Sequence, residues 1–238
     1  MAILCGGRGT RLQEHAREIP KPLVEIGGRP IVWHVVRIYA AQGFRRFLLL
    51  TGYKGELVAE FAAAEPWPEG VDVRCLDTGR DTPTGGRVRR AAAELGEGTA
   101  CVTYGDGVAD IDLDSLLAFH AAHRGEATMT VVRPALQFGV TDLDGAGRVT
   151  GFREKPRSEQ WINGGFFCFE PGVFDYLSED STLEREPLEG LARDSQLRAY
   201  RHEGFWDCMD TYKDAVLLND LWKTGDPPWR VWAEEPAL

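Results

Sequence analysis

The chain has 238 residues, of which 43% are hydrophobic, and its 27 Lys plus Arg against 37 Asp plus Glu give a net charge of −10. At this length one hydrophobic core can bury most of the chain's surface, so folding needs neither disulfides nor a metal. Nucleic acids and anionic membranes are bound by basic surfaces, and we therefore expect neither as a partner. An anionic ligand would have to be held by a few placed cations.

The five cysteines lie far apart and none belongs to a C-x-x-C pair. This spacing favours free thiols in a reducing compartment. The first residues run directly into a glycine turn without a signal-peptide pattern, and no apolar run reaches the ~20 residues of a membrane span. We therefore expect a soluble, cytoplasmic protein.

Apolar runs of strand length alternate with segments of helical period in the first half of the chain. Strands are expected at residues 2–5, 44–51 and 99–104, each followed by glycine. Helices are expected from Pro30 to a cap at Gly43, at residues 56–64 and 87–95, and from an N-cap at Asp114 to residue 123, with Leu117, Phe119 and His120 toward the sheet. This alternation is typical of a parallel sheet with helices on its faces.

After about residue 125 the pattern changes to strands separated by turn residues. Strands are expected at residues 127–132, 140–143, 149–152 and 165–169, and helices at 171–176, 187–193 and 214–223. The Trp- and Pro-rich end, residues 226–232, is expected to wrap over the body. The sequence thus predicts an α/β fold with a Rossmann-like, mostly parallel central sheet, helices on both faces and a small inserted β-hairpin region.

The strongest local feature is the glycine turn Gly6-Gly7-Arg8-Gly9-Thr10-Arg11-Leu12, which follows the first strand and precedes Lys21. Glycines here let backbone N–H groups approach a phosphate. The Rossmann pattern fails because Leu12 stands where its third glycine belongs, and the P-loop pattern fails because no Lys follows the last glycine. A simple strand-to-loop turn is the alternative, but Arg11 and Lys21 favour a polyphosphate.

This turn, followed by K-P-L-V-E-I-G-G-R-P-I at 21–31, is similar to the signature of the sugar-1-phosphate nucleotidylyltransferases. Further matches follow in the same order: Y-G-D-G at 104–107, F-R-E-K-P at 152–156, N-G-G-F-F at 163–167 and F-W-D-C-M-D-T at 205–211. Within that family, G-Y-K-G at 52–55 and G-D-G-V-A-D at 105–110 resemble the glucose-1-phosphate cytidylyltransferase branch. The resemblance implies the nucleotide-diphospho-sugar transferase type of fold.

The resemblance also implies one nucleotidyltransferase domain spanning residues 1–238. Residues 1–125 would mainly bind the nucleotide, and residues 126–238 would mainly bind the sugar phosphate and form the C-terminal wrap. It implies transfer of a nucleotidyl group from an NTP, with CTP favoured, to a sugar 1-phosphate, with α-D-glucose 1-phosphate favoured. The products would be a nucleotide sugar (CDP-glucose) and pyrophosphate.

Both reactants are anions, so catalysis of this reaction consists mainly of alignment and charge stabilisation. The family motifs assign Asp106 and Asp210 as ligands of Mg²⁺, Arg11 to the β/γ-phosphates and Lys21 to the α-phosphate. Carboxylate oxygens suit Mg²⁺, which usually takes one or two of them together with phosphates and water. Without the resemblance, Asp106 would be interpreted as a turn residue.

The remaining site residues are assigned on the same resemblance. The nucleotide-binding set is Leu4, Cys5, Gly6, Gly7, Gly9, Thr10, Arg11, Lys21, Thr82, Gly86, Arg87 and Gly105. The sugar-phosphate-binding set is Glu154, Lys155, Asn163 and Gly164. The alternative for the segment at 82–87 is a helix N-terminus opened by a glycine pair, with Arg87 facing solvent, and the alternative for Lys155 is a solvated surface lysine. His34 and His120 are expected to have packing roles.

Two other functions stay open at this point. The first is a uridylyl-, thymidylyl- or guanylyltransferase acting on another hexose or heptose 1-phosphate, because the same cations and aspartates would serve it. The second is a noncatalytic subunit that binds a nucleotide sugar, against which the retained charged residues argue. A homo-oligomer is expected in either case.

Overall fold

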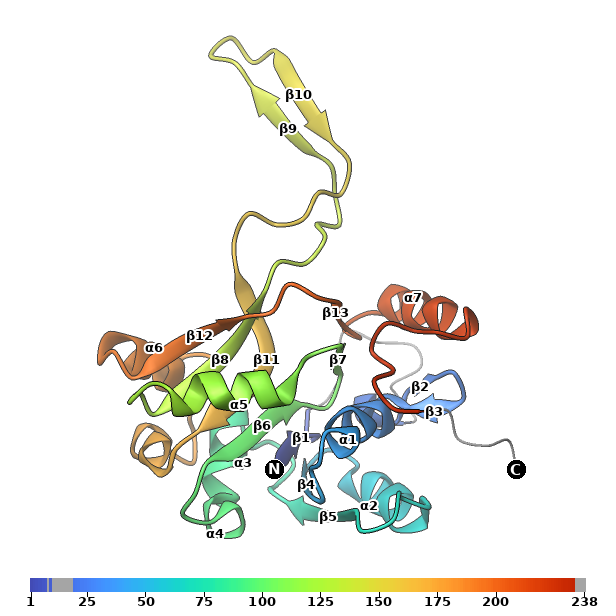
Figure 1. The fold of residues 1–238 in the computed structure, drawn as a ribbon, viewed down its shortest axis with the longest axis vertical. Helices are drawn as coiled ribbons and strands as arrows, with labels where there is room; N and C mark the ends of the chain where they lie inside the picture. Colours follow the sequence, from blue (N-terminus) through green and yellow to red (C-terminus); the bar gives the residue numbers. More distant parts are fainter. Residues whose placement is uncertain (8, 10–18, 234–238) are drawn as a thin grey trace.

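The computed structural model describes residues 1–7, 9 and 19–233, built around a seven-stranded sheet of order β12-β8-β11-β6-β1-β4-β5 (Figure 1). Its strands are Ala2–Leu4 (β1), Arg46–Thr51 (β4), Asp72–Asp77 (β5), Ala100–Tyr104 (β6), Ala127–Val132 (β8), Ile162–Phe169 (β11) and Leu197–Arg201 (β12). All neighbouring pairs are parallel except those made by β11, which is antiparallel to both β6 and β8. The predicted α/β class with a mostly parallel sheet is confirmed.

Helices cover both faces of this sheet because its central strands are apolar on both sides. Ile3 and Leu49 pack into one hydrophobic cluster, whereas Leu4 and Leu50 pack into another on the opposite face. The first cluster includes residues of α1 (Ile31–Ala41), α2 (Gly55–Ala64), α5 (Leu113–Ala121) and α7 (Tyr212–Lys223). The second includes residues of α3 (Thr84–Arg90), α6 (Glu186–Arg193) and the 3₁₀ helix η3 (Pro171–Tyr176).

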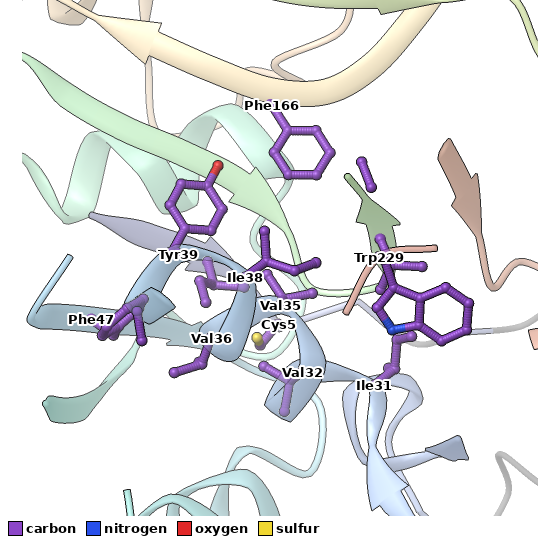
Figure 2. Packing of buried hydrophobic residues seen from close by; sticks show 14 of the residues in the cluster. Cys5, Ile31, Val32, Val35, Val36, Ile38, Tyr39, Phe47, Phe166 and Trp229 are labelled. Carbon is purple, nitrogen blue, oxygen red and sulfur yellow. The ribbon is translucent and has the colours of Figure 1, made fainter. Parts of the chain in front are cut away.

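Helix α1 lies at the centre of the first cluster and is buried on all sides from Ile31 to Ala40. Figure 2 shows Tyr39 of this helix facing Phe166 of β11, with 6.0 Å between the ring centroids. The C-terminal segment covers another side of this helix, where Trp232 contacts Trp33 and Arg37. Pro30 is the N-cap of α1 and does not lie inside the helix, and Gly43 follows the helix with φ +96°.

The expected wrapping of the C-terminal segment is confirmed by Trp229, which is fully buried. Its Nε1 donates a hydrogen bond to Nδ1 of His34 at 3.3 Å, and Nε2 of His34 lies 2.8 Å from the carbonyl oxygen of Ile26. Burial lowers the pKa of His34 to about 4. His120 is also buried, with Nδ1 2.8 Å from the hydroxyl of Thr128. Both histidines thus pack with hydrogen-bond partners, as predicted.

Helix α5 begins earlier than predicted. Asp112 is its N-cap and accepts a hydrogen bond from the Ser115 backbone N–H at 3.0 Å, so the expected cap at Asp114 is wrong. The buried residues of the helix are Leu113, Leu116 and His120, which share one helical face. Phe119, expected toward the sheet, is 37% exposed.

Other boundaries also differ. The single helix expected at 87–95 is two helices, α3 and α4 (Ala92–Leu95). Two strands of the main sheet, β5 and β12, were not predicted, nor were the short strands β2 (Glu25–Ile26), β3 (Arg29–Pro30), β7 (Gly107–Ala109) and β13 (Trp206–Cys208). The 3₁₀ helix η2 (Lys21–Leu23) precedes β2. In the described part of the chain, no helix is both long and apolar enough to span a membrane.

The predicted hairpin consists of β9 (Val140–Leu143) and β10 (Val149–Arg153), which pair antiparallel. We call residues 138–153 the arm, because they extend away from the body (Figure 1). The side chains of Phe138, Leu143, Val149 and Phe152 are exposed on it. At its base, the Leu136 backbone N–H donates to the Pro156 carbonyl at 2.9 Å, which joins the two chain segments that enter and leave the arm.

Candidate active site

A cavity of about 420 Å³ opens at the carboxyl ends of the parallel neighbours β1 and β6. Ligand sites in open parallel sheets commonly lie at these ends, where loops meet. Of the expected nucleotide-binding residues, those that line it are Leu4, Cys5, Gly6, Gly7, Gly9, Lys21, Thr82, Arg87 and Gly105. Asp106 and Asp210 line it as well. Thr10 and Arg11 lie outside the described residues.

Three charged side chains meet in this cavity although they lie far apart in the sequence. The Lys21 ammonium, on η2, donates to Oδ2 of Asp106 and, at 2.7 Å, to Oδ1 of Asp210. Asp106 lies two residues after the end of β6, and its carbonyl accepts from the Met209 backbone N–H at 2.9 Å, which joins the two aspartate-bearing segments. Burial alone would lower the pKa of Lys21, but the two carboxylates outweigh it and raise this pKa.

The two carboxylates fit a divalent cation by their chemistry, because they already converge on one positive group. Mg²⁺ typically takes one or two carboxylates and completes its shell with phosphate and water oxygens. Among the described residues, no group of three or more His, Cys, Asp or Glu side chains could hold a metal. Asp106 and Asp210 therefore suit a metal shared with a phosphorylated ligand rather than a closed protein site.

Arg87 is buried, with 4% of its surface exposed, so the alternative in which it faces solvent is wrong. Its guanidinium donates to the carbonyls of Thr51 and Gly79, both at 2.8 Å, and of Gly6 at 2.9 Å. A Cβ on Gly6 would lie 2.1 Å from this guanidinium, so glycine here leaves room for the Arg87 side chain as it is placed. Arg87 thus lines the cavity while its N–H groups hold the backbone of the glycine turn.

Gly86, which was expected in the nucleotide-binding set, does not line the cavity. A Cβ at Gly86 would lie 2.1 Å from the Glu179 carbonyl oxygen, and the Gly86 backbone N–H donates to the Ser181 carbonyl at 3.1 Å. The glycine is needed because residues 178–185, which we call the 178–185 loop, pack directly on α3. Thr82, which does line the cavity, accepts from Arg90 Nη1 at 3.1 Å.

The expected sugar-side residues fall in two places. Asn163, at the start of β11, donates from Nδ2 to the hydroxyl of Tyr104, a cavity residue, at 3.2 Å. The adjacent Gly164 carbonyl accepts from Trp206 Nε1 at 2.7 Å. Glu154 and Lys155 follow the arm with largely exposed side chains, and Lys155 lines a second cavity of about 500 Å³. Lys155 does not line the first cavity.

Three further residues at the cavity were not identified from the sequence. Tyr104 and Thr84 line it, and Glu184 contacts both of them. The Tyr104 hydroxyl donates to Oε1 of Glu184 at 2.5 Å, and the Thr84 hydroxyl donates to Oε2 at 2.7 Å. Tyr104 could have been suspected because it ends β6 beside Asp106. Glu184 carries no local signal, since its partners lie 80 and 100 residues away.

Fold and cavity together define a class: α/β proteins with a ligand-sized cavity where parallel strands end. The profile of the nucleotidyl transferase family matches residues 1–207. The glucose-1-phosphate cytidylyltransferase of Salmonella typhi is 41% identical, over 97% of this chain and 98% of that protein. The mannose-1-phosphate guanylyltransferase of Mycobacterium tuberculosis is 32% identical, over 90% of this chain and 62% of its own.

Among solved structures, HddC from Yersinia pseudotuberculosis, crystallised with GMP-PN, is similar with a TM-score of 0.72. The match covers 93% of this chain and 98% of that one at 20% identity, which supports the fold. The family profile and the sequence relatives show that this chain belongs to the nucleotidyl transferase family.

Proposed function

We propose that the protein transfers a cytidylyl group from CTP to α-D-glucose 1-phosphate, which forms CDP-glucose and pyrophosphate. The observation that carries the reaction is the convergence of Lys21 with Asp106 and Asp210 in a glycine-lined cavity. The choice of substrates is supported by the 41% identity, over nearly the whole length, to a glucose-1-phosphate cytidylyltransferase.

In this reaction an oxygen of the sugar phosphate attacks the α-phosphorus of CTP. A new phosphorus–oxygen bond forms to the sugar phosphate, the bond to the β-phosphate oxygen breaks, and pyrophosphate leaves with the electron pair. Negative charge on the reacting phosphates must be stabilised throughout, and fixed cationic donors do this most effectively. Lys21 is our candidate for this role at the α-phosphate, because its ammonium lines the cavity and the carboxylates of Asp106 and Asp210 keep it charged despite its burial.

Asp106 and Asp210 would hold Mg²⁺, which when bound supplies charge neutralisation to the phosphates. The backbone of Gly6, Gly7 and Gly9 would bind phosphate oxygens without hindrance from side chains. Two residues outside the described part of the chain belong to this proposal: Arg11 for the β/γ-phosphates and Thr10 as a further nucleotide-binding residue.

On the acceptor side we propose Asn163, Gly164 and Glu154 for the sugar and Lys155 for its phosphate. Asn163 is supported by its hydrogen bond to the cavity residue Tyr104. We further propose that residues 1–238 form one domain with a nucleotide-binding first half, acting as a homo-oligomer in the cytoplasm.

A second candidate is guanylyl transfer to another sugar 1-phosphate, or uridylyl or thymidylyl transfer. It is favoured by the 32% identity to a mannose-1-phosphate guanylyltransferase. Lys21, Asp106 and Asp210 would serve it equally well, so base and sugar must be decided by assay. A noncatalytic nucleotide-sugar-binding subunit would bind the same ligands without turnover.

The test is to follow pyrophosphate release with Mg²⁺, each of CTP, UTP, dTTP and GTP, and a panel of hexose and heptose 1-phosphates. We expect the highest kcat/KM with CTP and glucose 1-phosphate. We expect no turnover in Asp210→Asn, because the substitution keeps the size of the side chain but removes a carboxylate that would bind the metal. A preference for another NTP would overturn the cytidylyl proposal. If the wild type released no pyrophosphate in any combination, the result would favour the noncatalytic binding subunit. Normal turnover of Asp210→Asn would refute the metal assignment.

A further inference from the structure

A continuous chain of hydrogen bonds forms one wall of the cavity and joins four separate elements. It runs from Asn163 on β11 through Tyr104 on β6 and Glu184 in the 178–185 loop to Thr84, the first residue of α3. Tyr104 and Thr84 line the cavity, and the carboxylate of Glu184, which does not line it, accepts from both hydroxyls. One carboxylate therefore connects the expected nucleotide side of the cavity to its expected sugar side.

The donor and the acceptor of each hydrogen bond in this chain are defined. Glu184 accepts at both oxygens, from the Tyr104 hydroxyl at 2.5 Å and from the Thr84 hydroxyl at 2.7 Å. Because a tyrosine hydroxyl has one proton, Tyr104 can face Asn163 only as an acceptor, and it accepts from Nδ2 at 3.2 Å. Oδ1 of Asn163 accepts from the Gly165 backbone N–H at 2.8 Å, so the carboxamide is held in one orientation.

The 178–185 loop that carries Glu184 is itself fixed to α3. The Leu183 backbone N–H donates to the Thr84 hydroxyl oxygen at 2.9 Å, and the Leu183 side chain is fully buried. On the same loop, Glu179 forms an ion pair with Arg90 at 2.6 Å. Glu184 is thus held in place by neighbours, although the residue itself is exposed.

We propose that Glu184 is a positioning residue for the sugar 1-phosphate: by accepting the Tyr104 proton it fixes the Asn163 carboxamide in the orientation that binds the sugar. The inference rests on the proposed role of Asn163 in acceptor binding. With Nδ2 and Oδ1 each already engaged once, the second hydrogen of Nδ2 and the second lone pair of Oδ1 have fixed directions for a sugar hydroxyl. Such interactions act on binding of the acceptor more than on the chemical step.

The test compares Glu184→Gln, Tyr104→Phe and the double variant with the wild type. Gln keeps the size of Glu184 but can accept at one position only, so one of the two hydroxyls loses its acceptor. We expect a KM for the sugar 1-phosphate raised roughly tenfold, the value of about one lost hydrogen bond, with kcat and the KM for the NTP within about threefold. Because both substitutions break the same chain, the double variant should be no worse than Tyr104→Phe alone.

Glu170→Gln is the matched control, since Glu170 also accepts from a threonine hydroxyl, that of Thr99 at 2.5 Å, and lies just beyond the other end of β11. Its kinetics should equal those of the wild type. The side-chain amide NMR signals of Asn163 should shift in Glu184→Gln and stay unchanged in Glu170→Gln, which reports the orientation without turnover. Urea unfolding midpoints identify any variant that is merely unstable.

The assays use whichever NTP and sugar 1-phosphate the wild type turns over best. If the cytidylyl proposal is wrong, the substrate preference of the wild type will show it. If Glu184 does not position the sugar 1-phosphate, the comparison of KM values among the variants will show it. Unchanged sugar KM in both Glu184→Gln and Tyr104→Phe would overturn the proposal. So would additive losses in the double variant, or an equal rise of KM in Glu170→Gln.

Discussion

At the scale of single residues, the position of Lys21 is the feature with the clearest chemical consequence. Its ammonium bridges Asp106 and Asp210, the two carboxylates that fit a divalent cation. The same carboxylates raise the pKa of Lys21 against the effect of burial, so the lysine stays protonated at neutral pH. We therefore expect a metal that binds this pair to compete with the ammonium, which would then be available to a phosphate.

Lys21→Ala tests both roles of the ammonium. We expect kcat to fall by on the order of 10²–10³, as when another fixed donor to a developing oxyanion is removed. We also expect the protein without nucleotide to bind Mn²⁺ at least about tenfold more tightly, because the carboxylates lose their resident cation. Steady-state kinetics and the electron paramagnetic resonance signal of free Mn²⁺ measure the two effects separately.

Lys223→Ala is the matched control, since Lys223 forms an exposed ion pair with Asp220 at 2.8 Å. Neither its kcat nor its Mn²⁺ binding should change. If Lys21→Ala bound Mn²⁺ no better than the wild type, competition between ammonium and metal for these carboxylates would be refuted.

How much of the site could be predicted differs between residues. Lys21, Asp106 and Asp210 stand in continuous motifs, so the sequence identified them, and the structure brings them into one cavity. The environment of Arg87 could not be predicted, because three of its acceptors are backbone carbonyls from segments far apart in the sequence. Glu184 was missed for a similar reason: only the tertiary fold brings it to Tyr104.

At the scale of elements, the packing of the 178–185 loop on α3 gives the glycine pair at 85–86 a structural role. A Cβ at Gly85 would lie 2.7 Å from the Ser181 carbonyl oxygen, and one at Gly86 would lie 2.1 Å from that of Glu179. These are backbone atoms, which cannot move aside as the end of a flexible side chain can. The pair thus permits the close approach through which the loop reaches the cavity wall.

Gly86→Ala should therefore destabilise the protein. We expect a loss of roughly 1–3 kcal/mol in the free energy of unfolding, typical of overpacking, and a raised KM for the sugar 1-phosphate because the loop carries Glu184. Urea denaturation measures the first effect and the pyrophosphate assay the second. Gly98→Ala is the control, since nothing lies within 4 Å of a Cβ there, and an equal loss in that variant would contradict the packing argument.

The elements that the sequence did not reveal have a common physical origin. The missed strands of the main sheet, β5 and β12, are its two edges. Their residues are all half-buried or exposed, and both strands lack the continuous apolar run that identified the central strands. The shift of α5 arose because Asp112 and Asp114 are both good caps, and only the buried face of the helix decides between them.

At the scale of the whole molecule, the arm contributes little to the stability of the body. The two clusters that hold the body together lie on the two faces of the main sheet, and neither contains a residue of the arm. The arm's large apolar side chains are exposed, with Phe138 at 78% and Phe152 at 62%, so little hydrophobic free energy ties them to the body. The C-terminal segment contributes in the opposite way, because Trp229 is fully buried in the first cluster.

Excising residues 138–153 and joining the ends with two glycines should leave the body intact. The ends meet because the hydrogen bond between Leu136 and Pro156 lies outside the excision. We expect the free energy of unfolding to change by less than about 1 kcal/mol, whereas Trp229→Ala should cost roughly 3–5 kcal/mol through the cavity that it leaves. Urea denaturation of both variants measures this difference, and a loss in the excised protein as large as that in Trp229→Ala would show that the arm belongs to the folding unit of the body.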